Sequence, residues 1–186
     1  MTEQITLDNI HTFTIPLSEH SLKWKFEDES GQLSEEFKDQ IIPLTSEASI
    51  FLWNFQNTQK YLGAIPTMGK YYKEWREFSF GEHDSQKVKK WLFEREIPFD
   101  RKVFWVTQPQ WGFILTWKMV IKFSDDIFLG SNELIWDRTL NWALIYDHND
   151  VFYFGKNRIF DAKKHSEEMD GLNRLIKEIQ QGSINK

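Results

Sequence analysis

The chain has 186 residues, of which 40% are hydrophobic and 27% charged, so its composition is that of one folded domain rather than of a disordered chain. It contains no cysteine, which excludes a disulfide framework, a zinc–thiolate site and a cysteine nucleophile. No apolar run approaches the ~18 residues that a membrane span needs, and the N-terminus lacks the pattern of a signal peptide. We therefore expect a cytoplasmic protein without a membrane partner.

The aromatic content is unusual, at 16% of the residues, with nine Trp and sixteen Phe. Aromatic side chains bury much area each, so they can fill a dense core with few residues. Trp and Tyr are also frequent anchors at binding surfaces. Composition therefore predicts a dense core or a binding face without choosing between them.

The net charge of −5 is distributed unevenly. Residues 1–50 hold ten acidic and three basic residues, a formal charge of −7, whereas residues 60–118 carry +4. Nucleic-acid binding needs Lys and Arg clustered on one face, and the one dense basic run, Lys87, Lys89 and Lys90, is typical of a solvated helix face. We expect no nucleic-acid partner, whereas an acidic chain of this kind could bind a basic protein.

The first half of the chain predicts short extended segments followed by helices. Residues 12–17 and 22–26 alternate apolar and polar side chains, which predicts an edge strand or lead-in and then a half-buried strand or extended arm. Helices are predicted at residues 34–41, capped by Ser34, at 45–55, and at 85–97, capped by Ser85. For residues 57–84 we predict an irregular packed connection with one helical turn at 70–78.

From Val103 onwards the pattern predicts strands separated by turns. The predicted strands cover residues 102–108, 111–118, 119–123, 127–130 and 133–136, followed by a hairpin at 141–158. An apolar stripe over residues 172–182 predicts a final helix. The whole chain, 1–186, is thus predicted to be a single α+β domain. It would have N-terminal helices, a curved antiparallel sheet of five or six strands, and a C-terminal helix packed on the sheet.

The hairpin at residues 141–158 is apolar on both faces, so it is either covered on both sides or leaves one face open to a partner. Its tip carries Asp147, His148, Asn149 and Asp150. Asp and Asn suit hairpin turns because they bond their own backbone. The spacing is not that of a calcium loop, so we expect no metal site there.

No set of residues predicts catalysis, and we expect no enzyme and no cofactor. The chain lacks a Gly-x-Ser-x-Gly elbow, a glycine-rich phosphate loop and paired histidines. The strongest contrary pattern is Asp125 and Asp126 near Trp111 and Trp117, because two carboxylates beside a Trp platform could bind or hydrolyse a sugar. A turn between strands and packing in the core are the simpler interpretations.

Two blocks, residues 13–53 and 103–158, resemble a bacterial family known only as a domain of unknown function. The resemblance rests on the segment Trp24 to Phe26, on "IIPLTSEA" before Trp53, and on Trp111 followed by Trp117. It also rests on the Asp-Asp turn and on Gly155-x-x-Arg158. It implies one bacterial domain and supplies no catalytic residues.

The second block is also similar in style to small acidic immunity proteins of bacterial toxin systems, in "DDIFLGSNELIWD" and "WALIYDHNDVFYFG". That likeness implies a cytoplasmic protein that occludes a toxin, and the acidic N-terminal third would suit a basic toxin domain.

We therefore predict a non-enzymatic protein-binding module of the immunity-protein kind. The candidate partner-binding residues are Glu27, Asp28, Glu29, Tyr146, Asp147, Asp150 and Tyr153. The alternative is a small-molecule or carbohydrate-binding domain with a Trp-lined cleft, formed by Trp111, Trp117, Asp125 and Asp126. A third possibility is a self-associating domain in which the hairpin makes a homodimer.

Overall fold

The computed structural model describes residues 4–27, 33–63, 68–79, 84–129 and 131–159, together with Asp170, Arg174 and Lys177. Of the helix predicted at 172–182, only Arg174 and Lys177 are described, and both are helical and exposed. The predicted partner-binding residues Asp28 and Glu29 lie outside the described residues.

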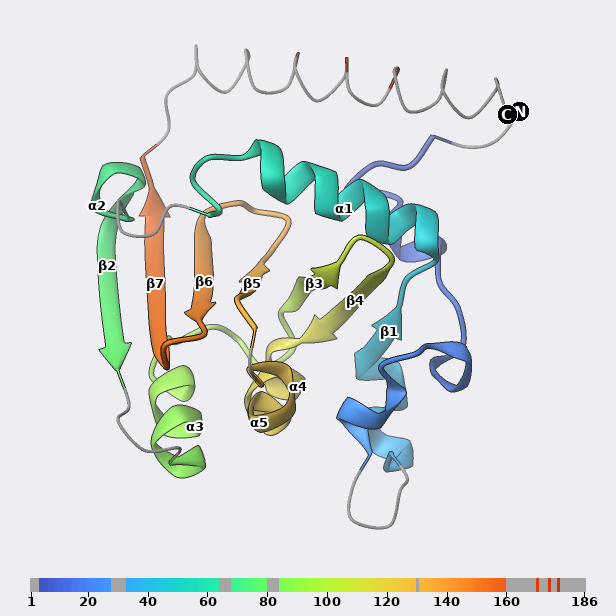
Figure 1. The fold of residues 1–186 in the computed structure, drawn as a ribbon, viewed down its shortest axis with the longest axis horizontal. Coiled ribbons are helices and arrows are strands. Elements are labelled where there is room, and N and C mark those ends of the chain that lie inside the picture. Colours follow the sequence, from blue (N-terminus) through green and yellow to red (C-terminus); the bar gives the residue numbers. More distant parts are fainter. Residues whose placement is uncertain are drawn as a thin grey trace.

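The described residues form one antiparallel sheet of seven strands in the order β1-β4-β3-β5-β6-β7-β2 (Figure 1). The strands are β1 (Ile41–Pro43), β2 (Tyr72–Ser79), β3 (Lys102–Gln108), β4 (Trp111–Thr116), β5 (Glu133–Trp136), β6 (Trp142–Asp147) and β7 (Val151–Arg158). The α+β class is confirmed, but the prediction of five or six strands was too low. The two strands that it missed, β1 and β2, are the edges of the sheet.

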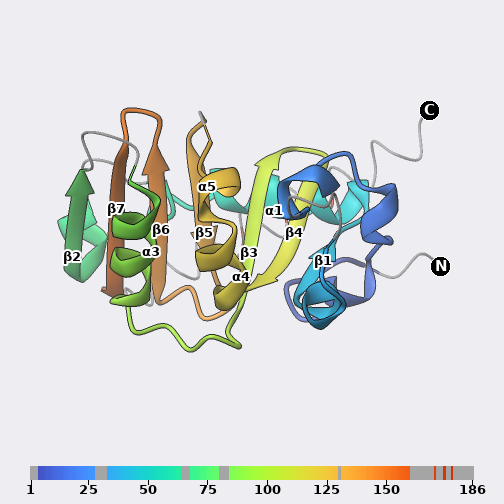
Figure 2. The same ribbon diagram turned by 90° about the horizontal axis from the view of Figure 1, so that it is seen from below.

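Helices cover both faces of this sheet, so the molecule has three layers (Figures 1 and 2). Helix α1 (Ser46–Thr58) packs Leu52 and Phe55 against one face. Helices α3 (Ser85–Phe93), α4 (Trp117–Lys122) and α5 (Ser124–Ile127) pack on the other face, and a short α2 (Met68–Tyr71) precedes β2. Two hydrophobic cores result, one on each side of the sheet, which is what strands apolar on both faces require.

Short 3₁₀ helices, η1 (Ile10–Thr12), η2 (Leu17–Glu19), η3 (Lys23–Phe26) and η4 (Glu35–Gln40), gather beside β1 (Figure 2). The predicted strand or arm at residues 22–26 is therefore wrong, because η3 occupies it. Leu22, Lys25 and Phe26 are buried while Trp24 is exposed. Alternation would place Trp24 on the same face as Leu22 and Phe26, whereas a tight helical turn separates them. The lead-in at 12–17 makes one bridge, Thr14 to Leu44.

The capping residues predicted at the helix N-termini were right only in part. The helix predicted at 45–55 is confirmed, and the Thr45 hydroxyl accepts the backbone N–H of Ala48 at 3.3 Å. Helix α3 is capped by Asp84, which accepts the backbone N–H of Lys87 at 3.1 Å, and not by Ser85 as predicted. The helix predicted at 34–41 is the 3₁₀ helix η4, followed by β1, and Ser34 makes no capping bond there.

The strands predicted at 119–123 and 127–130 are wrong, because the described residues form α4 and α5 up to Ile127 and no strand at Phe128 or Leu129. Met119, Phe123 and Ile127 are buried at intervals of four, the spacing of one helical face. The backbone N–H of Phe123 donates to the carbonyl of Met119, and that of Ile127 donates to the carbonyl of Phe123. A short continuous apolar run does not distinguish a buried strand from a buried helix, which is why the pattern misled.

The irregular connection predicted at 57–84 is wrong over its second half, where β2 forms an eight-residue strand. Its middle, residues 73–77, is exposed and mostly charged, so no alternation of apolar residues announces it. Pairing with β7 makes it a strand, in a register that places Trp75 opposite Gly155 and Phe78 opposite Phe152. Strand formation here depends on a partner distant in sequence.

Gly155 provides a test of this packing, because a Cβ atom at this position would lie 2.4 Å from the Tyr72 ring. We expect Gly155→Ala to lower the free energy of unfolding by about 1–3 kcal/mol through overpacking, measured by urea unfolding followed by Trp fluorescence. The matched control is Gly63→Ala, since nothing lies within 4 Å of that Cβ, and it should stay within about 0.5 kcal/mol of the original chain. Equal stability of both variants would contradict the close packing of Tyr72 on β7.

Candidate functional site

The hairpin β6–β7 is covered on both faces, as one of the two interpretations of its sequence predicts. Trp142, Leu144 and Tyr146 belong to the core beneath α3, α4 and α5, whereas Ala143 and Ile145 belong to the core beneath α1. All five are buried. The body of the hairpin therefore offers no open apolar face to a partner.

The tip of this hairpin is a turn built by Asp147. Its Oδ1 atom accepts the backbone N–H of Asn149 at 2.9 Å and the side-chain amide of Asn149 at 2.6 Å, and Asp150 takes a left-handed backbone with φ of 61°. Accepting that backbone N–H lowers the pKa of Asp147. The tip thus has the local explanation that its composition suggested.

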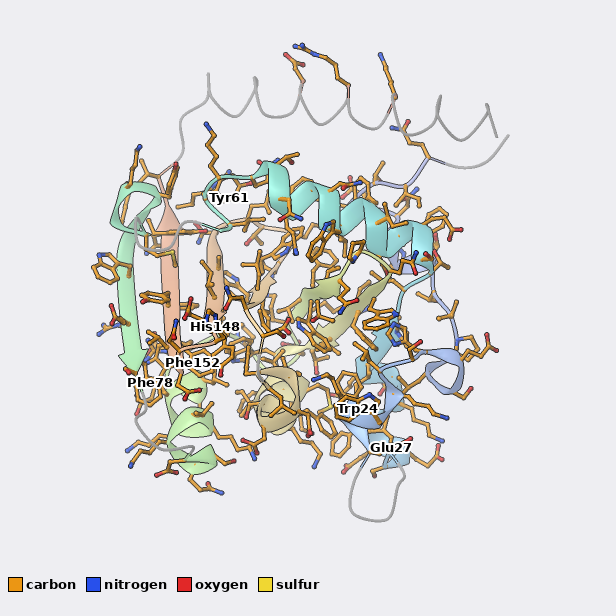
Figure 3. All side chains as sticks on the ribbon, in the orientation of Figure 1. Trp24, Glu27, Tyr61, Phe78, His148 and Phe152 are labelled. Atoms are coloured by element: carbon orange, nitrogen blue, oxygen red, sulfur yellow. The ribbon has the colours of Figure 1, made fainter. Side chains whose placement is uncertain are left out.

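Other residues fix the tip to the rest of the sheet. The Tyr146 hydroxyl donates to Asp150 at 2.9 Å. Two effects raise the pKa of Tyr146 to about 12: burial, which is the larger, and the hydrogen bond to Asp150. The backbone N–H of His148 donates to Asn132 at 2.9 Å, ahead of β5 (Figure 3). Among the predicted partner-binding residues here, Asp150 is exposed, Asp147 and Tyr153 are half-buried, and Tyr146 is buried.

A buried carboxylate that the sequence did not single out lies at the centre of the sheet. Glu133 accepts hydrogen bonds from the Trp105 indole at 2.7 Å, from Thr107 at 2.9 Å and from Ser131 at 2.6 Å. Burial raises the pKa of Glu133, while these donors and the Lys25 ammonium lower it. Its three donors make it a structural acceptor for the Trp105 ring.

Lys25 explains how the N-terminal helices attach to this centre. Its ammonium group is buried and donates to the backbone carbonyl of Asp126 on α5. It also lies 4.9 Å from the centre of the Trp24 ring, the distance of a cation–π contact. Burial lowers the pKa of Lys25, and Glu133 and Asp126 raise it. Trp24 is left 49% exposed above this anchor, and Glu27, at the end of η3, is half-buried (Figure 3).

His20 is a second buried ionisable group in the same region. Its Nδ1 atom accepts the backbone N–H of Leu22 at 3.1 Å, and its ring lies 4.2 Å from that of Phe113. Burial lowers the pKa of His20 from 6.5 to about 4. His20 therefore holds the start of η3 against β4 as a neutral ring.

The four residues of the alternative ligand site serve different parts of the structure. Trp117 has no exposed surface and lies edge-on to Trp142 in the core, and Trp111 is half-buried. Asp125 and Asp126 were predicted to form a turn between strands, but they occupy the first turn of α5. The Asp125 carboxylate accepts the Ser85 hydroxyl at 2.7 Å and lies 2.9 Å from the Lys89 ammonium, so it joins α5 to α3.

A groove that was not predicted runs past the C-terminal end of α3, as two adjoining hollows of about 310 Å³ and 400 Å³. They share Arg95, Glu96, Phe154 and Lys156, and none of the four residues of the alternative ligand site lines either hollow. Arg95 is buried, with its guanidinium 4.2 Å from the Trp91 ring. Cations and acids alternate along the groove and pair, as Lys156 and Glu96 do at 3.9 Å, so it carries no field of one sign.

Two further features concern metal ions and membranes. Within the described ranges, no group of three or more His, Asp or Glu residues is placed to hold a metal ion. No helix in the described part of the chain is both long enough and apolar enough to cross a membrane.

Comparison with protein-family models, with curated proteins and with solved structures finds no match to this chain.

We expect Glu133→Ala to lower the free energy of unfolding by about 3 kcal/mol, because it leaves the buried Trp105 indole without an acceptor and removes the nearby negative charge from Lys25. Urea unfolding followed by Trp fluorescence measures this. Glu133→Gln is the matched control, since its amide oxygen still accepts from the indole, and it should cost about 1 kcal/mol. Equal losses for the two variants would mean that the hydrogen bonds of Glu133 do not stabilise the sheet.

The lowered pKa of His20 gives the stability a defined pH dependence. Between pH 6.5 and about 4 the unfolded chain binds a proton at this residue and the folded chain does not, so stability must fall as the pH falls through that window. The full shift in the pKa of His20 would lower the free energy of unfolding by about 3 kcal/mol across this window. Because solvent reaches the charged ring in part, we expect a loss of about 2 kcal/mol.

The variant His20→Asn keeps an acceptor for Leu22 but cannot titrate. Urea unfolding at several pH values should show a shallower acid dependence for this variant than for the original chain. Identical slopes would remove His20 from the acid response.

Proposed function

We propose that this chain is a non-enzymatic protein-binding module whose partner is a basic protein, of the kind met in bacterial toxin–immunity pairs. The observation that carries the proposal is the surface of the acidic N-terminal region, defined as residues 4–27 and 33–47. Six of its acidic residues are exposed and Glu27 is half-buried. The exposed acids are Asp8, Glu19, Glu35, Glu36, Asp39 and Glu47.

Basic residues neutralise that surface only in part. Lys25 is turned inward to the Asp126 carbonyl, which leaves Lys23 and Lys38 exposed, and Lys38 pairs with Glu35. Arg138 lies 3.2 Å from Asp8, but the six exposed acids still outnumber the exposed bases Lys23, Lys38 and Arg138. The region is also compact, because η1 to η4 gather beside β1 at one edge of the sheet (Figure 2). A surface of one sign steers a partner of the opposite sign and accelerates association.

Trp24 supports the same surface with an aromatic anchor. Its ring is half-exposed, although the segment that carries it is fixed by the buried residues Leu22, Lys25 and Phe26. A large ring held in place loses little conformational entropy on binding, which is why Trp is frequent among the residues that dominate interface energies. Acidic side chains around a fixed Trp suit a basic protein with an apolar pocket.

The proposal excludes catalysis because the buried ionisable groups already serve the fold. Glu133 holds the Trp105 indole, and the half-buried Asp147 closes the hairpin turn. The buried Asp137 accepts the backbone N–H of Thr139 at 2.9 Å. Groups committed to such bonds are poor proton carriers, whereas the exposed acids of the N-terminal region are accessible to a partner.

The test is co-expression of the chain with the protein encoded beside its gene, followed by size-exclusion chromatography and titration calorimetry. We expect a complex whose affinity falls at least tenfold in Glu36→Lys/Asp39→Lys, and about thirtyfold in Trp24→Ala because an anchor ring is lost. Raising the salt concentration should also weaken the complex.

Glu94→Lys/Asp100→Lys is the matched control, with the same change of charge at exposed residues outside the acidic N-terminal region. It should bind nearly as the original chain does. A triple reversal of Glu27, Asp28 and Glu29 to Lys tests the rest of the predicted arm in the same assay. A partner that binds all of these variants equally well would remove the acidic N-terminal region from the interface.

A further inference from the structure

The two edges of the sheet are treated differently by the rest of the chain. Strand β1 has three residues, ends in Pro43, and lies beside η2 and η4. Strand β2 has eight residues, and within the described ranges its outer side pairs with no strand (Figure 1). An open edge of this length is a template for pairing with another chain unless its side chains prevent it.

Strand β2 is held firmly at its ends while its middle is exposed. At one end the Tyr72 hydroxyl donates to the Tyr61 carbonyl at 3.0 Å, and at the other the Phe78 ring stacks 5.3 Å from that of Trp91 (Figure 3). Between them, residues 73–77 are all exposed, and Trp75 is 50% exposed. The strand is therefore presented as a fixed edge.

The exposed segment is Lys73-Glu74-Trp75-Arg76-Glu77. When a second copy of this segment runs in the opposite direction, each charged residue faces a residue of opposite charge. Two copies of one strand that pair antiparallel are related by a twofold axis normal to the sheet. Residues that lie opposite each other point to the same face of the sheet, so their residue numbers are both odd or both even. In any one register the two residue numbers of every opposed pair therefore add to the same even number. With the axis at Trp75, Lys73 lies opposite Glu77 of the second copy, and Glu74 lies opposite Arg76.

Neighbouring registers lack this match. An axis at Glu74 sets Glu74 against itself, and an axis at Arg76 sets Arg76 against itself. Axes at Lys73 or Glu77 also oppose like charges. Opposite charges across an antiparallel pair stabilise it and like charges destabilise it, so the charges select the register centred on Trp75.

We propose that β2 pairs antiparallel with β2 of a second copy of this chain, with Trp75 at the twofold axis, so that one sheet continues through both copies. Four ion pairs and a Trp–Trp contact line the junction, beside the backbone hydrogen bonds of the two strands. The acidic N-terminal region lies beside the opposite edge of the sheet, so the dimer leaves it free for a different partner (Figure 2).

The absence of cysteine from the chain allows a direct test by cross-linking. Opposed residues of antiparallel strands have Cα atoms about 4.5–5.5 Å apart, within the range of a disulfide. Trp75→Cys should therefore give a covalent dimer under mild oxidation, seen on a non-reducing gel. Lys73→Cys is the matched control, because the two introduced residues would lie about 13 Å apart along the strands and should not cross-link.

Charge swaps test the register in solution by sedimentation equilibrium. Lys73→Glu and Glu77→Lys each place two like-charged pairs across the junction and should raise the dimer dissociation constant at least tenfold. The double variant Lys73→Glu/Glu77→Lys restores the pairs and should return to within about threefold of the original chain.

A chain that stays monomeric up to about 1 mM would overturn the proposal, and so would equal cross-linking at positions 73 and 75. A dimer that persists unchanged in the single swaps would place self-association elsewhere on the molecule. None of these outcomes bears on binding of a basic partner by the acidic N-terminal region.

Discussion

Two indole rings on opposite faces of the sheet, Trp105 and Trp136, each donate a buried N–H group to an acceptor on another element, and these bonds join the layers of the fold. Trp105 donates to Glu133 of β5 at 2.7 Å, and Trp136 donates to Gln56 of α1 at 3.3 Å. Gln56 in turn donates to the Val106 carbonyl at 3.3 Å. A buried donor without a partner costs about 1–3 kcal/mol, so these bonds help to fix α1 over one face and β5 beside β3.

The same requirement accounts for the way in which the chain uses its ionisable groups. Glu133 and His20 lie in the core as acceptors for groups that would otherwise be unsatisfied, and Lys25 donates to a helix carbonyl. These three residues tie η2, η3, α5 and the central strands into one unit. The buried ionisable groups thus serve the fold, and the proposed function rests on the exposed acids of the N-terminal region.

The two edges of the sheet give the surface two regions of different character. Covering β1 with 3₁₀ helices places the acidic N-terminal region, with the half-exposed Trp24, at that side. Leaving β2 uncovered presents a charged strand with a Trp at its centre. Because the regions lie at opposite edges of a seven-stranded sheet, the proposed binding of a basic protein and the proposed pairing with a second copy do not compete for the same surface.

The sequence by itself determined the elements whose signals are local. These are the α+β class, the Thr45 cap of α1, the strands from residue 102 onwards that alternate or pair in hairpins, and the turn at Asp147. Only the tertiary structure decided that residues 117–122 and 124–127 are helical, because a buried apolar run suits a strand as well as a helix until its neighbours are known. It alone decided that residues 72–79 are a strand, because their partner β7 lies about 80 residues further along the chain and their side chains are charged. The candidate surfaces divide in the same way: the excess of acids was visible in the sequence, whereas the burial of Lys25, the exposure of Trp24 and the open edge of β2 follow from packing between distant segments.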